Sequence, residues 1–178
     1  SCINLTSVTF ANMNGDMIIG DNAFYGCAQL TAIDVPAKTT SIGANAFYMT
    51  KLSVFTVPET VTHIGDLAFA YTNLTEIRIP AAVTYIGHGA FYKVTALSSV
   101  TFVGGTEPLV LGAVDMESTC LHLKSEKNPP VFDERGVFAD TALTEISLPA
   151  NISVIGDFTF NNLTALTAVN IPAQSQLK

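Results

Sequence analysis

The amino-acid sequence predicts an α/β repeat solenoid of about eight turns, in which short parallel strands alternate with short helical turns. Two observations lead to this prediction. A seven-residue phrase of the type Leu-Thr-x-Ile-x-Ile-Pro recurs along the chain, and most copies are followed by Ile-Gly and then by Ala-Phe. Self-similarity at a short fixed period is typical of repeat architectures, in which each unit buries its apolar face against its neighbours.

Leucines and phenylalanines mark the repeat period. In four units the strand leucine precedes a phenylalanine by 17 residues, and the next leucine follows after 5 or 6, so the period is 22 or 23 residues. All the variation in length falls at one corner, which is therefore predicted to be a surface loop. The leucines are Leu5, Leu30, Leu52, Leu74, Leu97, Leu143 and Leu166, and the phenylalanines are Phe24, Phe47, Phe69, Phe91, Phe138 and Phe160.

The unit that begins at Leu74 shows how one turn is expected to fold. Apolar residues around Ile77 alternate with Glu76 and Arg78, which is the pattern of a short strand with one buried face. Pro80 has no amide hydrogen and is expected to end this strand. A second, shorter extended piece is predicted just before the Ile-Gly pair.

A short helical turn is predicted through each Ala-Phe pair. The alanine allows the turn to approach the strands, and the phenylalanine fills the centre of the coil. An aspartate follows the glycine in three units, as Asp21, Asp66 and Asp157. Aspartate is a favoured N-cap residue, so these three carboxylates are predicted to cap the helical turns.

One segment, residues 103–136, departs from the repeat. The distance from Leu97 to Leu143 is 46 residues, which is two periods of 23. This spacing predicts an irregular repeat that forms a full additional turn, with Cys120 in the leucine position. Residues 1–178 are accordingly predicted to be a single array, and because both ends fall within a repeat, we expect it to be a fragment of a longer protein.

The combined motif, Leu-Thr-x-Ile-x-Ile-Pro followed by Ile-Gly-x-x-Ala-Phe and often by cysteine, resembles the BspA-like leucine-rich repeats of bacterial and some protist surface proteins. The resemblance covers nearly the whole chain except residues 103–136. It implies a right-handed leucine-rich-repeat solenoid that is secreted or displayed on the cell surface. It also implies a role in adhesion to host or matrix proteins, and it supplies no catalytic residues.

Composition excludes two classes of partner. The formal net charge is −7 and the basic residues form no run, so a nucleic-acid partner is not expected. Apolar stretches stay below the roughly 18–20 uninterrupted residues that a membrane span needs, so this segment is not expected to insert into a membrane.

Metal, cofactor and catalytic sites are not predicted. His63, His88 and His122 occupy different columns of the repeat and share no cluster of other metal-binding residues. The cysteines, which are Cys2, Cys27 and Cys120, are interpreted as buried apolar thiols. The acidic residues Glu107, Asp115, Glu117, Asp133 and Glu134 suit a solvated surface better than a calcium site. Sequence motifs of nucleophilic or phosphate-binding enzymes are absent, so an enzyme is the least favoured class.

Three interaction hypotheses remain. The first is a protein-binding or adhesive module that uses the outward residues of the strands, which stacking would align in ladders. The second is a structural spacer that presents another domain, because the ladders are small and polar and contain no aromatic residues. The third is glycan recognition by an aromatic column of Tyr25, Tyr48 and Tyr92, which follow the phenylalanines, although structural packing is the favoured interpretation of these tyrosines. The predicted partner-binding residues are Asp34, Thr56, Glu76, Arg78, Ser99, Thr101, Glu145 and Ser147.

Overall fold

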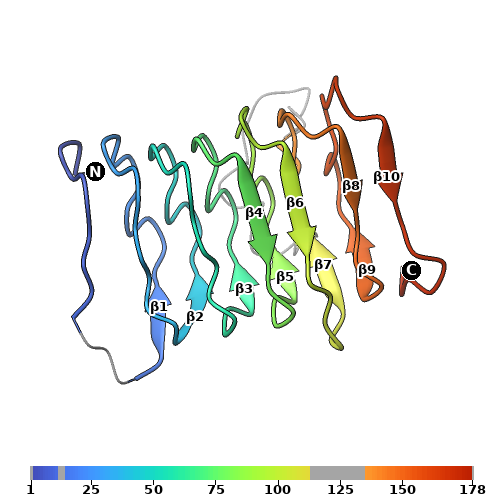
Figure 1. Ribbon diagram of the computed structural model, residues 1–178, viewed down its shortest axis with the longest axis horizontal. Coiled ribbons are helices and arrows are strands. Elements are labelled where there is room, and N and C mark those ends of the chain that lie inside the picture. Colours follow the sequence, from blue (N-terminus) through green and yellow to red (C-terminus); the bar gives the residue numbers. More distant parts are fainter. Residues whose placement is uncertain (1, 12–14, 113–134, 178) are drawn as a thin grey trace, which may run out of the picture.

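The computed structural model describes residues 2–11, 15–112 and 135–177. They form a parallel-strand solenoid whose turns lie side by side from the N-terminal to the C-terminal end (Figure 1). We call each turn a rung and name it by its strand leucine. The predicted repeat solenoid is confirmed, but with about six turns of about 23 residues rather than eight.

The continuous sheet of the solenoid runs through the segments that precede the Ile-Gly pairs. Its six strands, one from each successive rung, pair in parallel in the order β1-β2-β3-β5-β7-β9. The equivalent isoleucines are register partners, as in the pairing of Ile64 with Ile86. The strands are β1 (Met17–Ile19), β2 (Thr39–Ile42), β3 (His63–Ile64), β5 (Tyr85–Ile86), β7 (Leu109–Leu111) and β9 (Ile152–Ile155).

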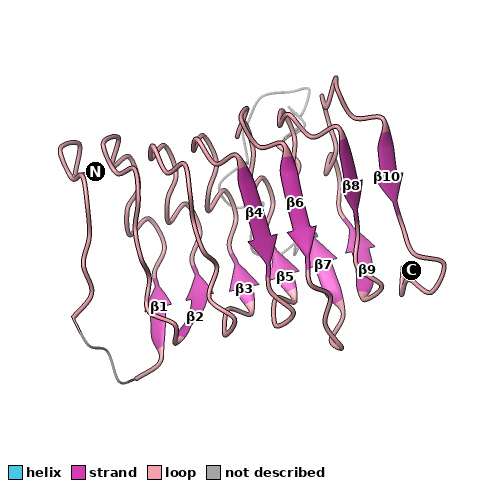
Figure 2. Cartoon of the chain, in the orientation of Figure 1, coloured by secondary structure: helices cyan, strands magenta, loops and turns pink. Residues whose placement is uncertain are grey.

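In each rung the Leu-Thr-x-Ile-x-Ile-Pro phrase lies on another side of the solenoid than the six-stranded sheet. These phrases form two separate strand pairs (Figure 2). These pairs are β4 (Glu76–Ile79) with β6 (Ser99–Phe102), and β8 (Glu145–Ser147) with β10 (Ala168–Asn170), and both are parallel. The predicted strand is therefore present in four rungs. In the rungs of Leu30 and Leu52 the equivalent segments are not assigned as strands.

Helical turns were predicted through Ala-Phe, but none of the described residues is helical. The reason is that every second backbone amide in this segment donates its hydrogen bond to a carbonyl oxygen of the next rung. The amides of Asn45, Phe47 and Met49 donate to carbonyl oxygens of the next rung at 2.8–3.0 Å, whereas those of Ala46 and Tyr48 donate three residues back. Positive φ angles at Asn45 (53°) and Met49 (56°) produce consecutive tight turns instead of a helix. The described part of the chain thus contains no helix that would be long and apolar enough to cross a membrane.

The aspartates after the Ile-Gly pairs link neighbouring rungs rather than cap helices. An Oδ1 atom of Asp21 accepts a hydrogen bond from the amide of Ala44 at 2.7 Å. Asp66 accepts the amide of His88 in the same way at 2.9 Å. Because each bond crosses to the next rung, these carboxylates help to hold the stack together. Asp157, the third predicted cap, is exposed.

The core consists of columns of identical side chains that run along the solenoid. Phe47, Phe69, Phe91 and Phe138 are fully buried, as are the strand leucines from Leu30 to Leu143. Neighbouring rings of the phenylalanine column are stacked, with centroid distances between 5.3 and 6.2 Å and interplanar angles of at most 15°. The predicted leucine and phenylalanine columns are therefore confirmed.

The cysteines do not all follow the prediction of buried thiols. Cys27 is buried three residues after Phe24, in the column that Thr50 and Thr72 occupy in the next two rungs. There the threonine hydroxyls donate to phenylalanine carbonyl oxygens, so the polar atoms are satisfied. Cys2 is exposed, contrary to the prediction. Cys120 lies outside the described residues.

The additional rung that we predicted within residues 103–136 is not part of the stack. The amide of Ala142 donates to the carbonyl of Leu97 at 3.0 Å, so these two rungs are in direct contact. Strand β7 pairs with β9 without an intervening strand. The ring of Phe91 lies 5.6 Å from that of Phe138, which is the ordinary rung spacing.

The repeat register explains how the interruption is accommodated. Phe91 follows Gly87 by four residues, and Phe138 would follow Gly112 by four if residues 113–134 were omitted. The described residues up to Gly112 and those of the Phe138 turn therefore belong to one rung. The predicted position of Cys120 in the leucine column lies outside the described residues, and Leu143 occupies the place next to Leu97.

Candidate interaction surface

The outward side chains of β4, β6, β8 and β10, together with their equivalents in the two preceding rungs, form a surface that we call the front strand face. Glu76 is the register partner of Ser99, and Arg78 is the partner of Thr101. Glu145 and Ser147 pair with the corresponding residues of β10. All six of these predicted site residues are exposed on one side of the solenoid, and the inward residues between them are largely buried.

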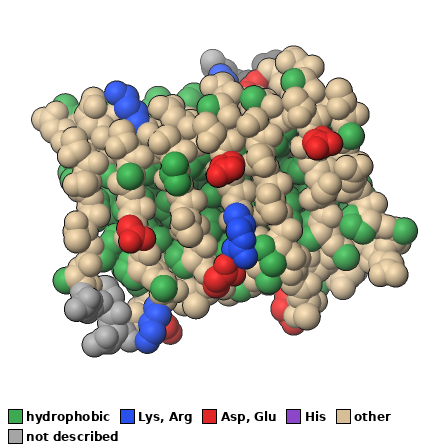
Figure 3. Space-filling view, viewed as in Figure 1, with side chains coloured by type: hydrophobic (Ala, Val, Ile, Leu, Met, Phe, Trp, Pro, Cys, Tyr) green, Lys and Arg blue, Asp and Glu red, His purple; other side chains and the backbone are tan. Residues whose placement is uncertain are grey.

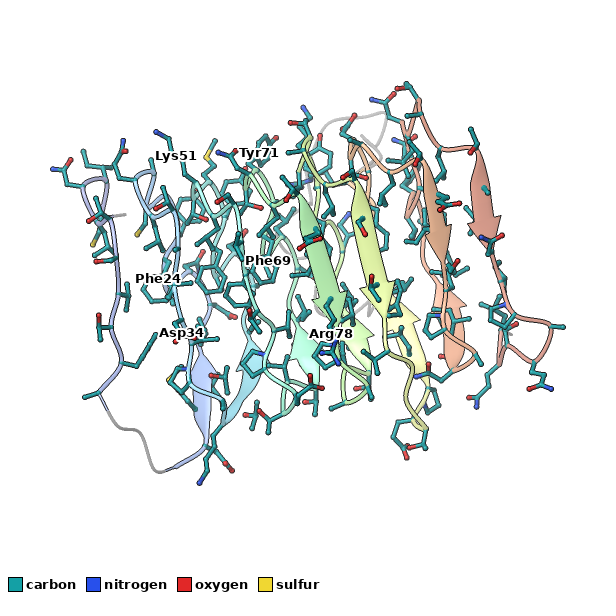
Figure 4. The ribbon with its side chains drawn as sticks, in the orientation of Figure 1. Phe24, Asp34, Lys51, Phe69, Tyr71 and Arg78 are labelled. Atoms are coloured by element: carbon teal, nitrogen blue, oxygen red, sulfur yellow. The ribbon has the colours of Figure 1, made fainter. Side chains whose placement is uncertain are left out.

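Asp34 and Thr56, the other two predicted site residues, are also exposed but lie outside the assigned strands. They precede a buried valine in each rung, as Arg78 precedes the buried Ile79. Figure 4 shows Asp34 and Arg78 on the same side of the solenoid. The repeat thus brings the predicted residues onto one surface, although hydrogen-bonded strands support only part of it.

Arg78 makes an ion pair with Glu59 of the preceding rung, with an Nη1–Oε1 distance of 2.5 Å. The two side chains are 53% and 66% exposed. Solvent screens a pair with this exposure, so it contributes at most about 1 kcal/mol to stability. Its main effect is to hold the guanidinium in place beside the ladder.

The front strand face is acidic and poor in aromatic groups. Figure 3 views this face and shows scattered acidic and basic side chains among uncharged and hydrophobic groups. Asp34, Glu76 and Glu145 are exposed, and Arg78 is the one basic residue among the eight predicted positions. Charge of this sign attracts a basic surface, and small side chains between the charges leave the backbone accessible.

Two shallow hollows cross this face. One lies between residues 54–57 and β4, and extends toward Ser99 and Thr101. The other lies between β6 and β8, which are not hydrogen-bonded strand partners. Both are open to solvent, and outward residues such as Thr56, Arg78 and Glu145 line them together with the inward residues of the same segments. The face is therefore suited to a broad contact rather than to enclosing a small molecule.

A column of four tyrosines lies at the phenylalanine turns. The rings of Tyr25 and Tyr48 are stacked, with centroids 5.0 Å apart and an interplanar angle of 2°. Tyr71 meets Tyr48 edge-on at 5.3 Å and Tyr92 edge-on at 5.6 Å. The aromatic column expected from Tyr25, Tyr48 and Tyr92 is present, and Tyr71 completes it.

Lys93 lies over the last two rings of this column. Its Nζ atom is 5.8 Å from the centroid of Tyr71 and 5.4 Å from that of Tyr92, which is within cation–π range. Interaction with Tyr71, followed by a hydrogen bond to Tyr92, raises the pKa of the Lys93 ammonium. Burial, followed by the neighbouring Tyr71 and Tyr25, raises the pKa of the Tyr48 phenol. The Tyr48 phenol and the Lys93 ammonium therefore keep their protons at neutral pH.

The sequence analysis missed Tyr71 and Lys93 as parts of this surface. Tyr71 is two residues after Phe69 instead of one, because Ala70 stands in the usual tyrosine position. The contacts of Tyr71 with the other tyrosines depend on its positive φ angle of 59°, which only the structure reveals. The signal available in the sequence was that every one of four successive Phe turns has a tyrosine within two residues.

A third feature lies on the outer surface of the six-stranded sheet. The ring of His63 is stacked on that of Tyr85, with centroids 4.6 Å apart. The two rings border an open hollow that Asp21 and Asp66 also line. Burial lowers the pKa of the His63 imidazole, and the two aspartates oppose this shift.

The described residues contain no cluster of three or more His, Cys, Asp or Glu side chains that would hold a metal ion. His63 and His88 lie in neighbouring rungs but in different columns, as predicted. His122 and four carboxylates of the possible calcium group, which are Asp115, Glu117, Asp133 and Glu134, lie outside the described residues. Glu107 is exposed on the loop before β7.

Solved structures with similar folds are bacterial leucine-rich repeat proteins. A leucine-rich repeat protein from Bacteroides ovatus ATCC 8483 superimposes with a TM-score of 0.70 and 22% identity, over 98% of this chain and 39% of that chain. The pneumococcal vaccine antigen PcpA superimposes with a TM-score of 0.61 and 24% identity, over 82% of this chain and 31% of that chain. The present chain thus spans less than two fifths of either protein. These likenesses concern the fold.

The family assignment comes from the sequence profile of the BspA type leucine-rich repeat region, which matches six copies in residues 1–109 and 134–177. A sequence comparison with characterised proteins gives no match. The interval between the two matched regions coincides with the interruption of the Leu97 rung. Since the match covers most of the chain and the columns of the fold agree with it, the chain belongs to the BspA-type leucine-rich repeat family.

Proposed function

We propose that this array is a non-catalytic interaction module that binds a protein of a host surface or matrix through its front strand face. The observation that carries the proposal is the register of the ladder, in which Glu76 lies beside Ser99 and Arg78 beside Thr101. A rigid array of this kind offers a large contact area with little loss of conformational entropy on binding. Leucine-rich repeat proteins in general mediate protein interactions.

A secreted or cell-surface location accompanies this proposal. One protein of similar fold is described as a pneumococcal vaccine antigen, which supports exposure to the outside of the cell. The acidic balance of the front strand face favours a partner with a basic patch. Binding by this face would therefore weaken as the salt concentration rises.

The experiment that tests the proposal removes three charges from the front strand face. The variant Glu76→Ala, Arg78→Ala, Glu145→Ala is compared with wild type for binding to immobilised host-surface and matrix proteins. A matched control also removes two acids and one base from exposed positions elsewhere, as Asp16→Ala, Lys38→Ala, Asp157→Ala. We expect the front-face variant alone to lose binding by at least about tenfold. Equal binding by wild type and the front-face variant would refute the proposal.

The alternative function is a structural spacer that presents another domain. The observation that favours it is the absence of aromatic residues among the eight predicted positions, since interaction hot spots are rich in tyrosine and tryptophan. In a longer protein, an unrelated rigid solenoid of the same length would then replace the array without loss of function. A binding module would not tolerate this exchange.

A further inference from the structure

We propose that the tyrosine column is a second docking surface and that it binds an acidic polypeptide segment. We call this surface the tyrosine corner and define it as Tyr25, Tyr48, Tyr71, Tyr92 and Lys93. Figure 4 shows Tyr71 near one edge of the solenoid, away from Asp34 and Arg78 on the front strand face. The proposal is therefore independent of the front strand face and can fail separately.

The packing of the rings determines which part of each tyrosine a partner can reach. Tyr25 and Tyr48 stack face to face at 5.0 Å, and Lys93 lies over Tyr71 and Tyr92, so ring faces are largely covered. Part of each tyrosine side chain reaches the solvent, because Tyr25 is exposed and the other three are half-buried. An aromatic edge carries positive partial charge, and a phenol donates a hydrogen bond. A row of such groups complements carboxylates.

The charged side chains within the loops of the corner are basic. Lys51 and Lys93 are exposed in the loops that carry Tyr48 and Tyr92. The four loops, residues 25–29, 48–51, 71–73 and 92–96, contain no aspartate or glutamate, although the chain as a whole has 15 acidic and 8 basic residues. Asp140 holds the equivalent position one rung further along, where it acts on Lys93 and accepts a hydrogen bond from Asn162.

The backbone of the corner holds these side chains in an unfavourable conformation. Met49, Tyr71 and Lys93 have φ angles of 54–59°, in the position that Gly26 occupies in the first of these turns with a φ of 65°. Glycine adopts this left-handed conformation without steric strain, whereas larger residues do so at a cost of about 1 kcal/mol or more each. The amides of Met49 and Tyr71 bond to the next rung at 3.0 Å, which fixes the turn.

These three observations together favour a specific contact. Tyrosine loses little conformational entropy on binding and is enriched in interaction hot spots. The corner presents a preorganised row of four tyrosines across four rungs, with ammonium groups beside it. An acidic segment of a partner protein that lies along the row would meet hydroxyl donors, positive ring edges and two lysines.

The test uses the intact chain with two labelled peptides, hexaglutamate and hexalysine, at low salt. Binding is followed by fluorescence anisotropy and by chemical shifts of the backbone amides. We expect hexaglutamate to bind saturably and to shift the amides of Tyr48, Tyr71, Tyr92 and Lys93, while hexalysine leaves them unchanged. Lys93→Glu should weaken hexaglutamate binding by about tenfold. Tyr71→Gly, which keeps the positive φ available, should weaken it by about threefold.

The control variant is Lys38→Glu, which makes the same change of net charge at an exposed position outside both surfaces. It should leave hexaglutamate binding within about twofold of wild type, because its site is separate from the corner. Equal losses in Lys38→Glu and Lys93→Glu would overturn the proposal, since net charge alone would then explain binding. Shifts at the corner caused by neutral oligosaccharides but not by hexaglutamate would overturn it in favour of a glycan.

A second copy of this chain is the remaining occupant to be distinguished, because its own front strand face carries Glu76 and Glu145. Light scattering over a range of protein concentrations measures this association. One outcome is a molar mass that grows with protein concentration in wild type but not in Lys93→Glu or in the double variant Glu76→Gln, Glu145→Gln. This result would assign the corner to self-association and overturn the proposal. A constant monomer mass together with hexaglutamate binding would support it.

Discussion

The change Phe69→Ala tests the packing that holds the rungs together. Phe69 is fully buried and stacks on Phe47 at 5.3 Å and on Phe91 at 5.5 Å. It also meets Phe55 edge-on at 4.8 Å. The substitution therefore removes three aromatic contacts and leaves a cavity between two rungs that cannot close without breaking inter-rung hydrogen bonds.

The expected loss of stability follows from these contacts. Replacing a buried phenylalanine by alanine costs about 3–5 kcal/mol, and the loss of favourable ring pairs places Phe69 at the upper end, near about 5 kcal/mol. Phe24 provides a matched comparison, because it is half-buried and stacks on Phe47 alone. Phe24→Ala should cost about 2 kcal/mol.

Urea unfolding followed by circular dichroism measures both values. We expect a lower midpoint for Phe69→Ala than for Phe24→Ala and an unchanged urea dependence if the array unfolds as one unit. The reasoning would be refuted if Phe69→Ala lost less than about 1 kcal/mol, or no more than Phe24→Ala, because the column would then not be a continuous core.

Three further predictions use the same unfolding measurement. Gly136→Ala should destabilise the chain by at least about 2 kcal/mol, because a Cβ at this position overlaps the carbonyl of Phe158. Gly20→Ala has open space around the added Cβ and should change stability by under about 0.5 kcal/mol. Equal effects of the two changes would contradict the close contact between Gly136 and Phe158. Asp66→Ala should cost about 1–2 kcal/mol through loss of its hydrogen bond to the next rung, and an unchanged midpoint would show that the bond does not bridge rungs in solution. Because the pKa of His63 is lowered from 6.5 in the folded chain, the unfolded chain binds a proton at a higher pH, and stability should fall as the pH drops below 6.5. His63→Gln should reduce this dependence of stability on pH. An identical pH dependence in the variant would show that His63 does not cause it.

Much of the architecture could be predicted because identical residues recur at a fixed spacing. Such residues must occupy equivalent positions in a stack, so the Leu97 and Phe91 columns follow from counting alone. The local conformation at Asn45 does not follow in this way. An Ala-Phe segment of good helical composition becomes a series of tight turns, because alternate amides find carbonyl partners on the neighbouring rung.

The error in the number of turns has a specific cause. Residues 113–134 comprise 22 positions, close to one repeat period, and the loop between Phe102 and Leu109 is also longer than in other rungs. The total happens to equal two periods of 23. Spacing alone could not distinguish an interruption of the Leu97 rung from an additional rung, whereas the hydrogen bond from Ala142 to Leu97 does so directly.

The candidate surfaces were predictable to different degrees. The front strand face follows from strand alternation, which is why Glu76 and Arg78 were correctly placed on one exposed side. The tyrosine corner depends on positive φ angles at Tyr71 and Lys93, and residues of these types give no sequence signal for that conformation.

The most direct test of the continuous stack is a nuclear Overhauser effect measurement between the aromatic protons of Phe91 and Phe138 in a phenylalanine-labelled sample. The structure places the two ring centroids 5.6 Å apart with an interplanar angle of 7°. We expect a cross-peak between these rings of similar strength to that between Phe69 and Phe91, whose centroids are 5.5 Å apart. A cross-peak for Phe69 and Phe91 with none for Phe91 and Phe138 would contradict the account, because another turn would then separate the two rings.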